Sequence, residues 1–203
     1  MLISLDELIK KYNVSIKGIL HVGAHECEEM RDYEKYVTIN KILWIEALPN
    51  KVEISKHKYP GVIIENAAVS DVEETVKFNV SNNGQSSSML ELGLHKVFHP
   101  EVKYVNSFNV KTKLLKHIIS NYDISFNFLN LDIQGAELKA LKGMEEYLHN
   151  IDYIYTEVNS DYVYKDCAIV GEIDEYLIKF GLHRVETAWF NNCRWGDAFY
   201  IRR

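Results

Sequence analysis

The sequence predicts an α/β fold in which a mostly parallel sheet carries helices on both faces. Short apolar segments alternate with helical ones along most of the 203 residues, and no linker rich in Pro, Gly or Ser interrupts them. The composition, 47% hydrophobic and 26% charged, is that of a globular protein. A chain of this length buries roughly 70% of its unfolded surface, which suffices for one core. We therefore expect a single domain over residues 1–203.

The first third of the chain alternates between helix and strand. A short helix is expected over 5–11. The apolar segment GILHV (18–22) predicts a strand, and a helix over 26–37 follows it. ILWI (42–45) predicts the second strand, and a proline then opens a helix over 49–58, because proline suits the first helical position. A third strand is expected over 62–69.

The alternation is then interrupted by a small β insertion at about 74–110. Alternating residues predict strands over 75–80 and 102–110, with the polar segment SNNGQSSS as a loop between them. The alternation resumes with a helix over 112–122, a strand over 126–131, a helix over 136–148, a strand over 151–158 and a helix over 172–180. Strands over 183–189 and 197–201 are expected to form a hairpin, which puts an antiparallel strand in the sheet.

Composition narrows the classes of partner. The net charge of −6 disfavours binding to nucleic-acid phosphates. The three cysteines contain no CxxC pair, so neither a zinc site nor a disulfide framework is indicated. The segment MLISLDELIKKYNV is too short and too charged for a signal peptide, and no apolar run approaches the roughly 20 residues that span a bilayer. We expect a soluble protein of a reducing compartment, the cytoplasm.

The first strand ends in the segment HVGAHECEE. Ligands of parallel sheets bind at the carboxyl ends of the strands, so this turn is a candidate site. It has one glycine where a dinucleotide site has three, and its glutamates disfavour a phosphate. A nucleoside ligand without phosphate, such as S-adenosylmethionine, fits better, although the glycine is also typical of a plain tight turn. The candidate cofactor residues here are His21, Gly23, Ala24 and His25.

The next two strand ends supply an acid and small residues. Glu46 follows the second strand about twenty residues after the glycine, which is the spacing of an acid that binds ribose hydroxyls. The alternative is a solvated acid near a helix start. Small residues after the third strand suit an adenine ring or simple close packing. The cofactor candidates at these ends are Glu46, Ala47, Asn66, Ala67 and Ala68.

The fourth strand runs into the segment LDIQGAE. Asp132 at this strand end is the candidate general base, since an alcohol must lose its proton during methyl transfer. The alternative role is a helix N-cap. Glu157 and Asn159, at the end of the fifth strand, are candidate acceptor residues. Two carboxylates suit a divalent cation, but no ligand cluster with metal spacing occurs, so no metal site is predicted.

The remaining acceptor candidates lie in the insertion and near the C-terminus. The SNNGQSSS loop is rich in hydrogen-bonding groups, as suits a polyhydroxylated acceptor, and a simple hairpin turn is the alternative. Aromatic residues with a polar group suit partly wet clefts. The candidates are Gln85, Ser86, Ser87 and Trp195, with His95 and His99 as further residues to test.

These segments together resemble the FkbM family of S-adenosylmethionine-dependent methyltransferases. The resemblance covers residues 18–201 and rests on the segments HVGAHECEE, WIEALP, NAAVSD, LNLDIQGAELKALKG, YIYTEVN and WGDAFYIR. It implies a Rossmann-like class I methyltransferase fold with a seven-stranded sheet whose last strand is antiparallel. Many such enzymes carry an acid where this chain has His21, which leaves Asp132 or a backbone carbonyl to bind the methionine ammonium group.

The leading hypothesis is an O-methyltransferase that acts on a hydroxyl of a sugar or glycan, because the resemblance implies such substrates. It also implies glycosyltransferase domains as partners or fusion neighbours. The alternatives are methylation of a small non-sugar alcohol or a protein side chain, and a binding module that has lost turnover. Nucleic acid is a less favoured acceptor, since the fourth strand lacks the N/D-P-P-aromatic loop that often serves amino-group methylation.

Overall fold

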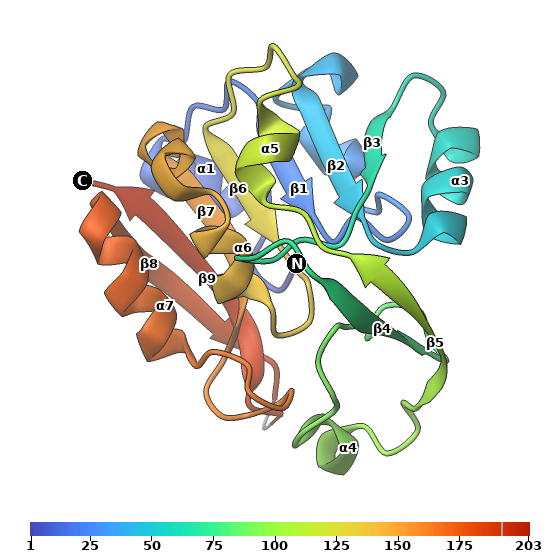
Figure 1. Ribbon diagram of the computed structural model, residues 1–203. Helices are drawn as coiled ribbons and strands as arrows, with labels where there is room; N and C mark the ends of the chain where they lie inside the picture. The colour runs from blue at the N-terminus through green and yellow to red at the C-terminus, as the bar shows by residue number, and fades with distance from the viewer. Residues whose placement is uncertain (192) are drawn as a thin grey trace.

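The computed structural model describes residues 1–191 and 193–203 (Figure 1). Its main sheet has seven strands in the order β3-β2-β1-β6-β7-β9-β8. Neighbours from β3 to β7 pair in parallel, and β9 is antiparallel to both β7 and β8. The strands are β1 (Ile19–Val22), β2 (Ile42–Glu46), β3 (Ile63–Asn66), β6 (Phe128–Leu131), β7 (Tyr153–Asn159), β8 (Leu182–Trp189) and β9 (Trp195–Arg202). The predicted mostly parallel sheet with an antiparallel last strand is confirmed.

Helices cover both faces of this sheet, because its strands carry apolar side chains in alternating directions. Leu20 and Val22 of β1 pack in a core with α5 (Leu115–Ile119), α6 (Glu137–Lys142) and α7 (Val170–Leu177). Ile19 packs on the opposite face. That second face is covered by α1 (Leu5–Tyr12), α2 (Met30–Tyr33) and η1 (Ile39–Lys41). The remaining short helices are α3 (Pro49–Lys58), η2 (Glu145–Asn150) and η3 (Ile178–Phe180). Among the described helices, none is long and apolar enough to cross a membrane.

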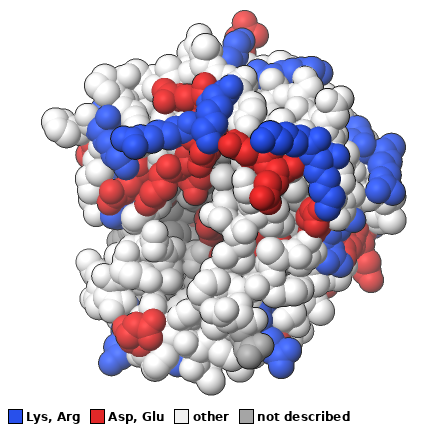
Figure 2. Space-filling view, turned by 180° about the vertical axis from the view of Figure 1, so that it is seen from behind, with Lys and Arg blue, Asp and Glu red and all other residues white. Residues whose placement is uncertain are grey.

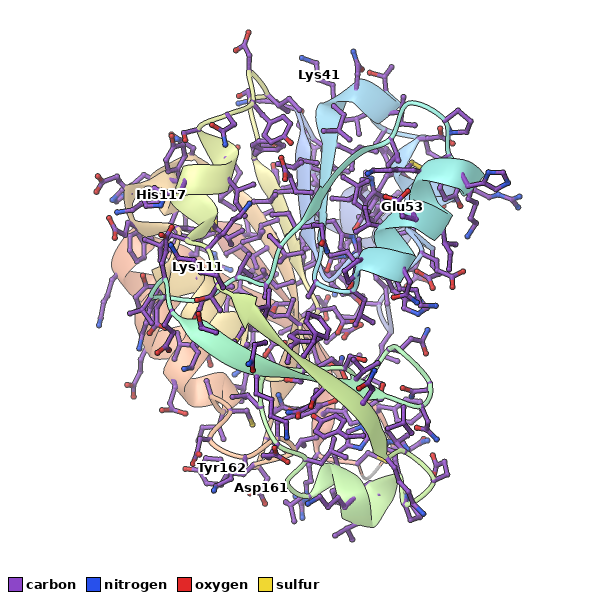
Figure 3. The ribbon with its side chains drawn as sticks, turned by 45° about the vertical axis from the view of Figure 1, so that its right-hand side comes forward. Lys41, Glu53, Lys111, His117, Asp161 and Tyr162 are labelled. Carbon is purple, nitrogen blue, oxygen red and sulfur yellow. The ribbon has the colours of Figure 1, made fainter. Side chains whose placement is uncertain are left out.

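The β insertion forms a separate two-stranded antiparallel sheet of β4 (Thr75–Ser81) and β5 (Tyr104–Lys111), with α4 (His95–Phe98) between them. In Figure 1 it lies below the main sheet. The loop after β7 binds it through backbone hydrogen bonds, since Leu94 N donates to Tyr162 O at 3.0 Å. Figure 3 shows Tyr162 and Asp161 close to α4. The insertion and this loop therefore form the lower wall of the space beneath the strand ends.

Several predicted boundaries were wrong. The helix expected over 26–37 begins only at Met30, because His25 and Cys27 have φ angles of 42° and 56° and the chain passes through turns first. The helix expected over 136–148 ends at Lys142, and a 3-10 helix over Glu145–Asn150 begins at a residue whose φ is 49°. The helix expected over 112–122 is limited to Leu115–Ile119. The third strand ends at Asn66, three residues before its expected end.

Gly23 joins β1 to the first turn in a position that only glycine fits. Its φ is 92°, and a Cβ atom there would lie 1.8 Å from the carbonyl oxygen of Asp132. Gly61 has nearly the same φ, 90°, but nothing lies within 4 Å of an added Cβ. The two glycines therefore separate the effect of backbone conformation from the effect of close approach.

We expect Gly61→Ala to lower the free energy of unfolding by about 1–3 kcal/mol, the usual cost of a strained backbone position. Gly23→Ala should cost distinctly more, because the end of β6 must also move. Urea unfolding of both variants measures the difference. Equal losses in the two variants would show that the contact between Gly23 and Asp132 is not tight.

Candidate active site

A cavity of about 450 Å³ opens at the carboxyl ends of the parallel strands. Its size falls within the range of about 300–1,000 Å³ that is usual for small-molecule sites. The ends of β1, β2, β6 and β7 form its upper wall, and the loop between β4 and α4 forms part of the opposite one. Of the predicted site residues, those that line the cavity are His21, Gly23, His25, Glu46, Ala47, Ala67, Ala68, Gln85, Ser86, Ser87, Asp132, Glu157 and Trp195.

Three predicted site residues do not reach the cavity. Ala24 is buried, and its N–H donates to Ile45 O at 3.0 Å. Asn66 uses its amide group to bind the carbonyl oxygens of Glu46 and Ala47, at 2.9 and 3.1 Å. Asn159 is fully buried, and its side-chain oxygen and nitrogen have no partner among the described residues. Ala24 and Asn66 therefore help to hold the strand ends, and the contacts predicted between these three residues and a ligand stay predictions.

Glu46 connects the end of β2 to the first turn. One carboxylate oxygen accepts a hydrogen bond from His25 N and the other from Leu48 N, both at 2.7 Å. A carboxylate has about four lone-pair sites, so each oxygen still has room for a hydroxyl group. The side chain is 7% exposed and faces the cavity, and burial raises the pKa of its carboxyl. This arrangement matches an acid that binds a pair of ribose hydroxyls.

His21 lies in a buried polar network beneath the first turn. Its Nδ1 is 2.9 Å from the hydroxyl oxygen of Tyr33, which accepts a hydrogen bond from Asn130 Nδ2 at 2.6 Å. Its ring stacks on Trp44, with 4.6 Å between the ring centres. Burial lowers the pKa of His21 to about 3, so the ring is neutral near pH 7. His21 therefore offers no charge to a ligand.

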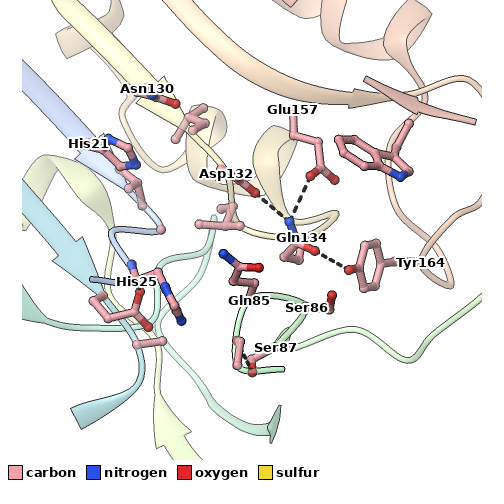
Figure 4. Close-up of a pocket in the computed structure, with 18 of the residues that line it drawn as sticks. His21, His25, Gln85, Ser86, Ser87, Asn130, Asp132, Gln134, Glu157 and Tyr164 are labelled. Carbon is pink, nitrogen blue, oxygen red and sulfur yellow. Dashed lines mark hydrogen bonds between the residues drawn. The ribbon is translucent and has the colours of Figure 1, made fainter. Parts of the chain in front are cut away.

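Asp132 lies at the centre of the cavity in Figure 4, between His21 and His25 on one side and Glu157 and Tyr164 on the other. The amide nitrogen of Gln134 donates to Asp132 Oδ1 at 2.6 Å and to Glu157 Oε2 at 2.9 Å. The amide oxygen of Gln134 accepts from the Tyr164 hydroxyl. Gln134 therefore holds both carboxylates in place, although sequence reasoning did not select it.

The acids of this group repel one another. Burial within the cavity walls, together with the carboxylates of Asp197 and Glu29, raises the pKa of Asp132 to about 6. Burial and the carboxylates of Asp132, Glu137 and Asp197 raise the pKa of Glu157 well above its usual value. Asp132 remains exposed to the cavity. A group with a pKa near 6 is ionised at neutral pH and can still accept a proton.

Asp132 is not the cap of α6. The N-cap position belongs to Ala136, and the preceding turn is held by Glu137. One carboxylate oxygen of Glu137 accepts from Ile133 N at 3.1 Å and from Gly135 N at 3.0 Å. The structure therefore favours a ligand-facing role for Asp132 over the alternative of a helix cap.

Aromatic side chains form the wall of the cavity opposite the first turn. Phe190 and Trp195 stack with 4.6 Å between ring centres, and Trp195 Nε1 donates to His99 Nε2 at 3.4 Å. The rings of His95 and Tyr164 lie 5.3 Å apart. Sequence reasoning selected Trp195 and proposed testing the histidines, but Phe190 gave no signal. We call His95, His99, Tyr164, Phe190 and Trp195 the aromatic wall.

The SNNGQSSS loop approaches the cavity from the insertion. The Ser87 hydroxyl donates to Gly84 O at 2.6 Å and accepts from Ser81 N at 3.0 Å, and Ser86 Oγ accepts from Asn83 Nδ2 at 3.1 Å. These hydroxyls maintain the loop, whereas Gln85 is exposed and lines the same cavity as Asp132. Over the residues that the structure describes, no three His, Cys, Asp or Glu side chains gather in a way that could hold a metal ion.

Comparison with known proteins identifies the class. A family model described as the methyltransferase FkbM domain matches residues 21–185. A methyltransferase from Clostridium acetobutylicum that depends on S-adenosylmethionine has a similar fold, with TM-score 0.54, 7% identity, and 98% of this chain and 89% of that chain covered. The ribosomal protein L11 methylase of Lactobacillus delbrueckii subsp. bulgaricus gives TM-score 0.54 and 9% identity over 96% of this chain and 74% of that chain.

Magnesium protoporphyrin IX methyltransferase from Synechocystis, solved with bound S-adenosylmethionine, gives TM-score 0.53 and 8% identity over 98% of this chain and 76% of that chain. No curated protein sequence matches this chain. The fold is that of Rossmann-like methyltransferases, and S-adenosylmethionine is the cofactor of the family whose model matches. The chain belongs to the FkbM methyltransferase family.

The residues of the cavity fit this cofactor. Glu46 has lone pairs left for ribose hydroxyls, and the small side chains of Ala67 and Ala68 line the same cavity. Their contact with an adenine ring stays a prediction. Glu29 and Asp132 provide negative charge around the space between the two walls, which suits a sulfonium cation.

We expect Glu46→Ala to weaken binding of S-adenosylhomocysteine by more than about tenfold, because each hydrogen bond to a charged group contributes about 1.5–3 kcal/mol. Calorimetry measures the affinity, and circular dichroism checks folding, since the change also frees two backbone N–H groups. Glu53→Ala, on the exposed face of α3, is the control and should bind normally. Unchanged affinity in a folded Glu46→Ala protein would remove Glu46 from the cofactor site.

Proposed function

We propose that this protein transfers a methyl group to a hydroxyl of a sugar or glycan, with Asp132 as the general base. The observation that supports the proposal is the place of Asp132 between the first turn and the aromatic wall of one cavity. We assign His21, Gly23, His25 and Glu46 to the cofactor half, and the aromatic wall with Gln85 and Glu157 to the acceptor half. When bound, S-adenosylmethionine supplies an activated methyl group.

The proton of the acceptor hydroxyl would pass to Asp132. Its Oδ1 accepts from Gln134, and its Oδ2, which has no hydrogen-bond partner among the described residues, can take that proton. Gln134 also fixes the direction of the carboxylate, so the acceptor oxygen can be aligned with the methyl group. Alignment and proton acceptance are the two contributions that a weakly acidic hydroxyl requires.

The acceptor half suits a ring with several hydroxyl groups. Phe190 and Trp195 present stacked rings on which an apolar ring face can pack, while Gln85 and Tyr164 offer hydrogen-bonding groups. A panel of neutral sugars and glycans, assayed for release of S-adenosylhomocysteine, tests the acceptor class. Turnover of simple alcohols or peptides in preference to every sugar would replace this proposal with the corresponding alternative.

Asp132→Asn should lower kcat by about 10²–10⁴-fold, the usual contribution of a general base. The asparagine has nearly the same shape, so folding and affinity for S-adenosylhomocysteine should stay within a few-fold of the original. Steady-state kinetics and calorimetry separate the two effects. A loss confined to cofactor affinity would make Asp132 an anchor for the methionine ammonium group instead.

The value of kcat/KM should also fall as the pH is lowered, because a general base must be deprotonated to act. Below its pKa of about 6 Asp132 is protonated, so kcat/KM should fall by about tenfold per pH unit on the acid side. Glu29→Gln removes a nearby negative charge, lowers the pKa of Asp132 and should move the acid limb to lower pH. Glu53→Gln should leave the limb in place. An acid limb that stays fixed in Glu29→Gln would contradict the assignment.

A further inference from the structure

We infer that the acceptor is a sugar without negative charge, methylated after glycosyl transfer and not as a nucleotide sugar or sugar phosphate. This inference rests on the proposed function and specifies the substrate class of the same site. It is carried by the charges of the cavity walls and by the groups available in the acceptor half.

Seven acidic residues line the cavity, and among the described lining residues there is neither Lys nor Arg. In Figure 2 acidic side chains gather above a hollow in the surface, with Lys and Arg beyond them. The acids that line the cavity are Glu28, Glu29, Glu46, Glu101, Asp132, Glu157 and Asp197.

Three of these acids belong to the acceptor half, and Asp132 lies between the two halves. Glu157 and Asp197 lie opposite each other on β7 and β9, and Asp132 shares the Gln134 amide with Glu157. Glu101 lies at the rim, 3.6 Å from His99 Nδ1. Enzymes that bind phosphate or carboxylate groups use Arg, Lys or helix N-termini for them. An anionic acceptor would meet like charge here, and that arrangement acts against binding.

A neutral hydroxyl compound meets suitable partners in the same space. His95 is 5% exposed, lines the cavity, and its Nδ1 has no hydrogen-bond partner among the described residues. A buried polar atom normally has a partner, so this nitrogen points to a hydroxyl supplied by a ligand. Burial and the neighbouring His99 lower the pKa of His95 to about 4, so the ring stays neutral and gives an anion no charge to bind.

The inference fixes the order of two reactions. A nucleotide sugar carries two negative charges on its diphosphate, which glycosyl transfer removes with the nucleotide. The substrate of this enzyme must then be supplied by a glycosyl transfer, and its product is an already methylated glycoside. Methylation of the activated sugar before transfer would need a cationic phosphate site in the cavity.

The test compares matched acceptors at fixed S-adenosylmethionine: methyl glycosides of common hexoses and deoxyhexoses, the same sugars as uridine or guanosine diphosphate derivatives, and their uronic acids. We expect kcat/KM for the neutral form to exceed that of the anionic forms by about 10–100-fold. Glu101→Lys should lower this preference for the neutral form. Glu53→Lys is the control, because Glu53 is exposed on α3, does not line the cavity and is labelled in Figure 3, so it should leave the preference unchanged.

Preferred turnover of the diphosphate or uronic acid forms would overturn the inference and leave the proposed sugar methylation intact. Turnover of no sugar in any form would overturn the proposed function, and this inference with it. As a second measurement, calorimetry of the protein loaded with S-adenosylhomocysteine compares a methyl glycoside with its 6-phosphate. Binding of the phosphate at equal or greater affinity would also contradict the inference.

Discussion

The close approach of Gly23 to the carbonyl oxygen of Asp132 fixes the geometry on which the site depends. Since β1 and β6 are neighbours, their ends meet where a side chain at position 23 would have no room. Gly23 N also donates to Ile45 O at 2.9 Å, which fixes the end of β2. Backbone contacts therefore fix the positions of the first turn, Glu46 and Asp132 relative to one another. These positions determine the shape of the cavity.

The acceptor side is attached to the same framework. Gln134 has a φ of 58°, and its carbonyl oxygen accepts from Ser88 Oγ at 2.8 Å. A Cβ atom on Gly84 would lie 3.2 Å from His25 Nε2, so the insertion loop also reaches the first turn. The loop of the insertion is thus hydrogen-bonded through Ser88 to the segment that carries Asp132, and at Gly84 it approaches the first turn.

Much of this arrangement could be predicted from the sequence, because parallel strands bring their carboxyl ends to one edge. Apolar runs identified the strands, and Glu46 and Asp132 follow directly after two of them. Left-handed residues were harder to predict, since His25, Cys27 and Gln134 give no local signal for a positive φ. The late start of α2 follows from the turns at His25 and Cys27.

The aromatic wall and the partners of Asp132 depend on contacts between distant segments. Phe190 and Trp195 meet His99 only because the loop after β7 and the β8–β9 hairpin fold onto the insertion. Asn66 and Asn159 stood at plausible strand ends, but their side chains turn toward the backbone or the interior. The ends of the predicted strands therefore show which segments form the site, whereas the direction of each side chain depends on its packing in the folded protein.

A crystal structure with S-adenosylhomocysteine and a neutral methyl glycoside tests the division of the cavity most directly. We expect the ribose hydroxyls within hydrogen-bond distance of Glu46, the sulfur near Asp132, and the sugar between the aromatic wall and Gln85. A nucleoside lying against Phe190 and Trp195, with the sugar beside Glu46, would contradict the assignment of both halves.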